Sequence, residues 1–287
     1  MEERGPRVAG PGLLSTTPGA PHVLVAGSVN SLARIVAQRL VDALAFRLKD
    51  EWVSAAHVAM SGGVLTEAVI ESVADSLAKH RVDWDKVHIW WTDERYLPDG
   101  SGARFDTRAR SAGLARIGIP AERIHPVPGP ARPEDESPDE AAREYGALLR
   151  KYAPHGRQAP MFDLVLLEVA GDGAVASLEP GRAVLRSSDS VVPIFDAEPP
   201  APLRVAMSLS TLAGSARVWL LGMGADRADA VRRALVAGPD AASLPAARAR
   251  GILETLWWLD QHAARYVPRG DATTLADADA DADADGG

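Results

Sequence analysis

The amino-acid sequence predicts an α/β fold in which a mostly parallel β-sheet is flanked by helices. Short apolar runs alternate with longer segments whose apolar residues recur at helical spacing, and each run ends in glycine or polar residues. Strands are expected at 22–26, 57–60 and 87–91, and helices at 32–48 and 66–78. This β-α-β-α-β order favours parallel strands joined by right-handed crossovers.

The remaining elements continue the pattern with less regularity. Ser137 and Glu140 flank a proline at the start of a helix expected to reach residue 152. Residues 162–169 (FDLVLLEV) are almost continuously apolar, which is typical of a central parallel strand. Further strands are expected at 203–209 and 217–221, and closing helices at 226–235 and 251–264.

Length and composition predict one folded domain with an extension at each end. With 287 residues and 46% hydrophobic residues, the chain can bury a sizeable core. We expect a single domain at 22–268, a disordered leader at 1–21 and a disordered acidic tail at 269–287. Alternating alanine and aspartate near the end of the tail offers no apolar face and repels itself.

Composition also narrows the classes of partner. Cysteine is absent, which excludes disulfides, thiolate metal sites and cysteine nucleophiles, and fits a cytoplasmic protein. The net charge of −8 gives no basic footprint for nucleic acid. No apolar run approaches the length of a membrane span, and the first residues do not form a secretion signal. We therefore expect a monomer with a small-molecule ligand.

Three polar or glycine-rich segments follow predicted strands. They are Ser61-Gly62-Gly63, Asp93-Glu94-Arg95 and Gly171-Asp172-Gly173. Because ligands of open parallel sheets bind at the carboxyl ends of the strands, we expect these segments to converge into one site.

Each segment has a chemical reading and a plain structural alternative. The Ser61-Gly62-Gly63 loop before a helix suits a phosphate, although such loops are also common turns. Asp93, Glu94 and Arg95 can orient a sugar hydroxyl or clamp a phosphate, or they can form an ion pair that fixes the loop. Asp172 can orient a catalytic group, or it can serve an ordinary turn.

Several standard catalytic signatures are missing. The sequence has no G-x-S-x-G elbow, H-E-x-x-H helix, Walker loop or G-x-G-x-x-G motif. None of the seven histidines stands at metal-ligand spacing from another, so we expect no metal site. The seven tryptophans are most simply explained as core packing.

Taken in order, these segments resemble the 6-phosphogluconolactonase family over about residues 22–264. The most specific part is W-T-D-E-R at 91–95 together with D-G-A-V-A-S-L at 172–178. The resemblance implies a Rossmann-like fold of the sugar-phosphate isomerase and deaminase group (NagB/RpiA-like). It implies hydrolysis of 6-phospho-D-glucono-1,5-lactone to 6-phosphogluconate in the pentose phosphate pathway, without a cofactor. The substrate-binding residues that it implies are Ser61, Gly62, Gly63, Asp93, Glu94, Arg95, Gly171, Gly173, Ser177 and Arg227.

The chain departs from the family pattern where that pattern carries its chemistry. The histidine that activates water in the D-G-H motif is Ala174 here, and two leading glycines are Glu168 and Ala170. Alanine cannot accept a proton, so activity is expected to be impaired. Asp172 and Glu179 are the candidate replacements for the base. Glu168 adds bulk and negative charge near the expected pocket.

Three hypotheses follow from this comparison. The chain is a divergent and impaired 6-phosphogluconolactonase, or a non-catalytic relative that binds a sugar phosphate or a protein. A third reading, an isomerase or deaminase of amino-sugar phosphates, is disfavoured by the W-T-D-E-R and D-G-A-V-A-S-L segments.

Overall fold

A computed structural model describes residues 20–130, 132, 137–197, 201–236 and 238–275. Residues 1–19 of the predicted leader and 276–287 of the predicted tail lie outside these residues, while Pro21, at the end of the predicted leader, already belongs to the first strand. The described elements are β1 Pro21–Ala26, α1 Val29–Arg47, β2 Ala56–Met60, α2 Val64–Asp75, β3 Val87–Trp91, β4 Asp93–Arg95, α3 Phe105–Ala109, α4 Ala115–Ile117, β5 Ile124–His125, α5 Asp139–Lys151, β6 Leu164–Glu168, β7 Val191–Ile194, β8 Arg204–Met207, α6 Leu209–Ala213, β9 Arg217–Gly222, α7 Ala228–Leu235, α8 Pro239–Ser243, α9 Pro245–Arg248, β10 Glu254–Asp260 and β11 Ala272–Thr274.

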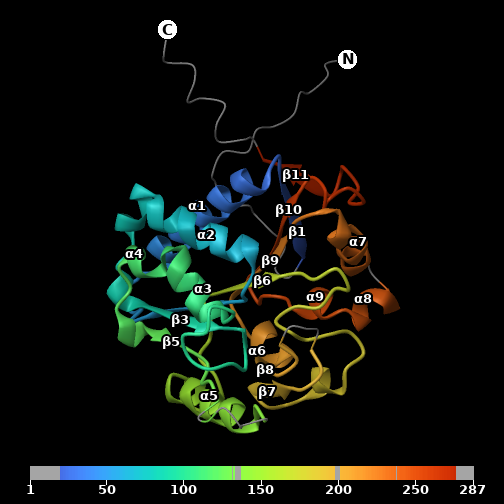
Figure 1. Cartoon of the computed structure of the whole chain (residues 1–287). Helices are drawn as coiled ribbons and strands as arrows, with labels where there is room; N and C mark the ends of the chain where they lie inside the picture. Colours follow the sequence, from blue (N-terminus) through green and yellow to red (C-terminus); the bar gives the residue numbers. More distant parts are fainter. Residues whose placement is uncertain (1–19, 131, 133–136, 198–200, 237, 276–287) are drawn as a thin grey trace, which may run out of the picture.

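A large parallel sheet forms the centre of the fold. Its strand order is β11-β1-β10-β9-β6-β2-β3-β5, and every neighbouring pair is parallel. Figure 1 shows α1 and α2 together on one side of this sheet and α7, α8 and α9 on the other. The predicted α/β class is therefore confirmed. None of the described helices is long and apolar enough to cross a membrane.

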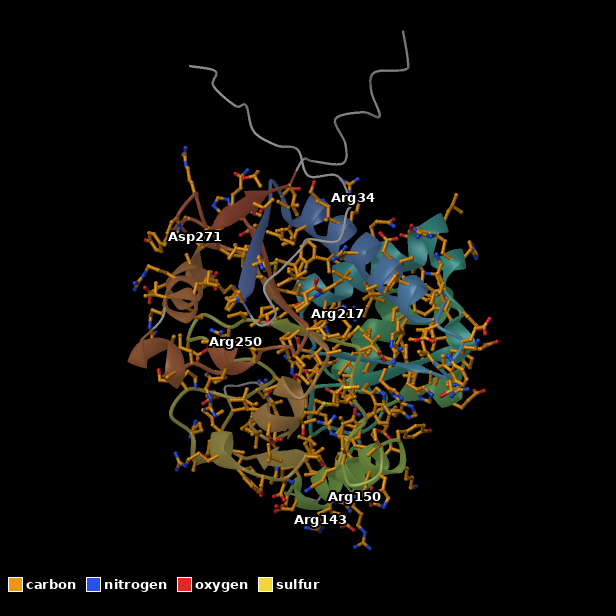
Figure 2. All side chains as sticks on the ribbon, turned by 180° about the vertical axis from the view of Figure 1, so that it is seen from behind. Arg34, Arg143, Arg150, Arg217, Arg250 and Asp271 are labelled. Atoms are coloured by element: carbon orange, nitrogen blue, oxygen red, sulfur yellow. The ribbon has the colours of Figure 1, made fainter. Side chains whose placement is uncertain are left out.

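A second, smaller sheet has the order β4-β8-β7 and is antiparallel. Residues 93–95, which we expected as a polar strand end, form its edge strand β4 and pair with β8. Because β4 follows β3 after only Thr92, this sheet begins at the carboxyl edge of the large one. Helix α5 packs against it, with Arg143 and Arg150 on the exposed face of that helix (Figure 2).

The prediction of a closing helix at 251–264 is wrong. Residues 254–260 form strand β10, which lies between β1 and β9. Its run of Leu256, Trp257, Trp258 and Leu259 is buried on both faces. Such a run has neither helical nor alternating periodicity, so it does not distinguish a buried strand from a buried helix. Trp257 and Trp258 pack in the core as expected, but they do so from a strand, whereas Trp52, one of the seven tryptophans assigned to packing, is 95% exposed.

The C-terminal extension enters the fold further than predicted. Residues 272–274, inside the range expected to be a disordered tail, form β11 and pair in parallel with β1. Backbone pairing continues at Leu275, whose N–H donates to the carbonyl of Val25 over 2.8 Å. The start of the predicted tail therefore belongs to the sheet.

Three histidines stack at the β2–β3–β5 side of the sheet. Arg123 donates to His88 Nε2 over 2.6 Å, so neutral His88 carries its proton on Nδ1, 2.8 Å from His125 Nε2. The His57 ring stacks on His88 at 4.7 Å between centroids. Burial is the main cause that lowers the pKa of each histidine to about 4, and the charge of Arg123 adds to it at all three, with neighbouring histidines contributing at His57 and His125.

This cluster predicts a loss of stability in acid. The unfolded chain binds protons near pH 6.5 but the folded cluster does so only near pH 4, so the free energy of unfolding falls as pH drops between these values. We expect each group to contribute at most roughly 3 kcal/mol, because partial exposure to solvent screens the effect. Urea unfolding between pH 7 and pH 4.5 measures this slope. A His88→Gln variant should flatten it, and an unchanged slope would contradict the assignment.

Candidate active site

The carboxyl ends of β2 and β6 are joined by Ser61. Its N–H donates to the carbonyl of Leu166 over 2.9 Å, and its Oγ accepts the N–H of Glu168 over 2.7 Å. Gly62 and Gly63 then lead into α2. Gly63 has φ of +155°, a conformation that side-chain-bearing residues rarely adopt. The first predicted segment thus lies at the rim of the sheet, with its serine used to link two strands.

The carboxylate of Glu168 reaches the N-terminus of α2. Its Oε1 accepts the N–H of Thr66 over 2.6 Å. A Cβ atom placed on Gly63 would lie 2.2 Å from the carboxyl carbon. Burial raises the pKa of Glu168, while the N–H of Thr66 and the charge of Arg227 lower it. The Glu168 carboxylate therefore satisfies an N–H group at this helix end and offsets its positive potential.

A second polar cluster lies at the end of β3. Asp93 is 4% exposed and accepts hydrogen bonds from Ser177 Oγ over 2.5 Å and from Thr92 Oγ1 over 3.1 Å. Arg204 Nη1 donates to Ser177 Oγ over 3.0 Å. Burial raises the pKa of Asp93, against the hydrogen bond from Ser177 and the charge of Arg204. Asp93 and Ser177, 84 residues apart, therefore meet, which joins the W-T-D-E-R segment to the D-G-A-V-A-S-L segment.

Glu94 is fully buried, and its carboxylate is bound by backbone N–H groups of the chain itself. Its carboxylate accepts the N–H groups of Arg95, Phe105 and Asp106 over 2.7, 2.9 and 2.9 Å. Arg104, 1% exposed, lies 3.9 Å from it and donates to the carbonyls of Leu97 and Val127. These contacts support the loop-fixing alternative for Glu94. Sequence reasoning missed Arg104, because a buried arginine has no local signal.

Arg95 lies near Asp93 and contacts the loop that precedes α3. Its Nη1 donates to the carbonyl of Ala103 over 2.6 Å, and its guanidinium lies 5.0 Å from the centroid of the Phe105 ring. Burial and the charges of Arg204 and Arg108 lower the pKa of Arg95, against the neighbouring carboxylates. The guanidinium groups of Arg95 and Arg204 thus both lie near Asp93. Arg204 was not among the predicted site residues, since its pairing with Ser177 is set only by the tertiary fold.

The third predicted segment is a tight turn after β6. Gly173 has φ of +88° and donates its N–H to the carbonyl of Ala170 over 3.0 Å. The Asp172 carboxylate accepts the N–H of Ala174 over 2.9 Å, and Ala174 is buried. Gly171 packs near the backbone of Asp226. Asp172 therefore has a defined turn role, which supports the structural alternative for this segment.

The last two predicted residues are both paired. Glu179 forms an ion pair with Arg182 over 2.8 Å and borders a cavity of about 170 Å³ that also touches Ser177. Arg227 pairs with Asp226 and donates to the carbonyl of Val169 over 3.3 Å. Its charge reaches Glu168. Glu179 thus lies near Ser177, whereas Asp172 does not border that cavity.

Comparison with known proteins decides the family. A family model described as glucosamine-6-phosphate isomerases/6-phosphogluconolactonase matches residues 27–258. The chain belongs to this family. The 6-phosphogluconolactonase of Streptomyces coelicolor is 34% identical over 256 residues, covering 87% of this chain and 95% of that protein. The 6-phosphogluconolactonase of Mycobacterium tuberculosis is 39% identical over 194 residues, covering 67% of this chain and 78% of that protein.

Solved structures of the family share the fold. The 6-phosphogluconolactonase of Trypanosoma brucei superposes with a TM-score of 0.73 at 22% identity, covering 87% of this chain and all of that one. A monomeric glucosamine-6-phosphate deaminase reaches 0.67 at 18% identity, covering 85% and 99%. The expected Rossmann-like fold of the isomerase and deaminase group is therefore confirmed.

Within this family fold, the expected common hollow is neither of two cavities that the described residues form. One, of about 440 Å³, lies between α2 and α3 and is bordered by Glu67 and Arg108. The other is the cavity at Glu179. The three predicted segments lie at the carboxyl edge of the large sheet, but Ser61, Arg95 and Asp172 border neither cavity. No cluster of described residues has the composition of a metal site.

Proposed function

We propose that the chain hydrolyses a sugar lactone slowly, as an impaired member of the 6-phosphogluconolactonase type. The joining of the motif segments at one sheet rim carries this proposal, above all the contact of Asp93 with Ser177. The reference substrate is 6-phospho-D-glucono-1,5-lactone, which the names of the relatives indicate. We keep the monomeric state and the cytoplasmic location as predictions, together with a single domain that begins near residue 22 and, with β11, reaches Thr274.

The chemistry requires water to attack the lactone carbonyl carbon. The ring C–O bond then breaks, the ring oxygen takes a proton, and an open-chain acid results. Negative charge develops on the carbonyl oxygen during the attack, and preorganised positive groups stabilise it. The guanidinium groups of Arg95 and Arg204 beside Asp93 supply such a charge distribution.

The missing element is a group that takes the proton from water. Ala174 stands where the family motif has histidine. The candidate replacements are engaged elsewhere, Asp172 with the Ala174 N–H and Glu179 with Arg182. General base catalysis contributes roughly 10²–10⁴-fold, so the chain should fall short of a histidine-bearing relative by about that factor. The same observation supports the second candidate, a non-catalytic relative that binds a ligand or partner.

A rate measurement separates these two candidates. Purified full-length chain is mixed with D-glucono-1,5-lactone or its 6-phosphate, and acid release is followed at constant pH against the spontaneous rate. We expect release above background that is lost in an Arg95→Gln variant, because that change removes one positive group beside Asp93. Arg143→Gln, which changes an exposed cation on α5, should leave the rate unchanged.

Background rates in the wild type would contradict the enzyme proposal. If the wild type, Arg95→Gln and Arg143→Gln all match the spontaneous rate on both lactones, the non-catalytic candidate replaces it.

A further inference from the structure

Both glycines of the Ser61-Gly62-Gly63 loop are covered by side chains of the chain itself. A Cβ atom on Gly62 would lie 1.9 Å from the Phe105 ring, and one on Gly63 would lie 2.2 Å from the Glu168 carboxyl carbon. Phe105 and Glu168 therefore fill the space that a glycine-rich loop normally leaves open for a ligand. The two residues come from different elements, α3 and β6, and close the loop from two directions.

The Glu168 carboxylate takes the position that suits a bound anion. It accepts the Thr66 N–H in the first turn of α2, a 12-residue helix whose first turn presents unpaired N–H groups. Arg227 adds positive charge nearby. The backbone N–H of Glu168 is itself fixed by Ser61 Oγ, so the side chain leaves from an anchored point.

Phe105 and Glu168 block the glycine loop by their volume as well as by charge. Burial raises the pKa of Glu168, but a protonated carboxyl fills the same volume as a charged one. Phe105 is held in place by its own N–H, which donates to the buried Glu94, and by the Arg95 guanidinium over its ring. Neither residue can leave without breaking contacts to other parts of the site.

We propose that Glu168 is a specificity-determining residue whose side chain fills the anion position of the glycine loop, and that the site takes a lactone without a phosphate group. A phosphomonoester directed at the Gly63 side of this loop would compete with Glu168 for the Thr66 N–H, while Phe105 covers the Gly62 side. A neutral aldonolactone needs neither position and can use the polar groups around Asp93 and Ser177. The proposal rests on the proposed function in taking a lactone as the ligand.

Binding of two stable acids tests the proposal independently of turnover. Isothermal titration compares gluconate with 6-phosphogluconate, which differ only in the phosphate. The wild type should show no preference for 6-phosphogluconate. Glu168→Gly should raise the affinity for 6-phosphogluconate by roughly ten- to a hundredfold, the value of one hydrogen bond to a charged group, and leave gluconate unchanged.

Glu168→Gln is the matched control because it removes the charge and keeps the volume. It should remain closed to 6-phosphogluconate, like the wild type. The proposal is overturned if the wild type already prefers 6-phosphogluconate, or if folded Glu168→Gly gains no affinity. If Glu168→Gly does not fold, the relative affinities of the wild type and of Glu168→Gln for gluconate and 6-phosphogluconate still test the proposal. Absence of lactone turnover would refute the proposed function. The two affinities would still show whether the glycine loop accepts a phosphate group.

Discussion

An Ala174→His variant is expected to hydrolyse D-glucono-1,5-lactone roughly 10²–10⁴ times faster than the wild type. Ala174 lies in the turn after β6, and its N–H is held by Asp172, so the backbone at this position is already fixed. An imidazole has a pKa near neutrality and can take the proton from an attacking water. Initial rates of acid release, corrected for spontaneous hydrolysis, measure the change.

The matching control is Ala174→Gln, which adds similar bulk without a titratable group. It should stay at the wild-type rate. Because Glu168 occupies the loop before α2, the gain on the 6-phosphorylated lactone should require Glu168→Gly in addition. A histidine variant that folds but hydrolyses neither lactone faster would show that this rim no longer binds a lactone productively.

Replacing Glu94 with glutamine is expected to lower the free energy of unfolding by about 3–5 kcal/mol. Glu94 accepts three backbone N–H groups and faces Arg104, and both side chains are almost completely buried. Glutamine keeps the size but removes the charge opposite the buried guanidinium and offers only one acceptor oxygen. Urea unfolding at pH 7 measures the change as a lower midpoint.

The control for this change is Glu144→Gln, which alters an exposed carboxylate on α5. It should stay within about 0.5 kcal/mol of the wild type. A loss below about 1 kcal/mol in Glu94→Gln would mean that the charge of Glu94 is not needed to hold the loop from Ala103 to Asp106.

Much of the fold follows from patterns that are local in the sequence. Helix α1 lies within a few residues of its predicted range and is capped by Ser28, whose Oγ accepts the N–H of Ser31. The alternation of apolar runs and helices predicted the parallel sheet. The misassigned segment, 254–260, is flanked by β1 and β9, which are distant in sequence, and only that position explains its uniform burial.

The site could be predicted as a set of segments but not as a set of contacts. The positions of Ser61 and Asp93 after strands placed them at one rim. The contact of Glu168 with Thr66 spans 102 residues, and that of Ser177 with Asp93 spans 84. The resemblance placed the bulk and charge of Glu168 near the expected pocket, but nothing local in the sequence indicates that its carboxylate reaches Thr66 and fills the glycine loop.

The short strand β11 shields one border of the large sheet. Without residues 272–274, the backbone of β1 on that side would present unpaired N–H and C=O groups along the apolar run HVLVA. Such a bare apolar strand is a template for pairing with another molecule. With β11 in place, the edge strand of the sheet is instead short and polar, and its Thr273 and Thr274 are exposed. A trimmed version ending before Ala272 would therefore be prone to self-association through β1.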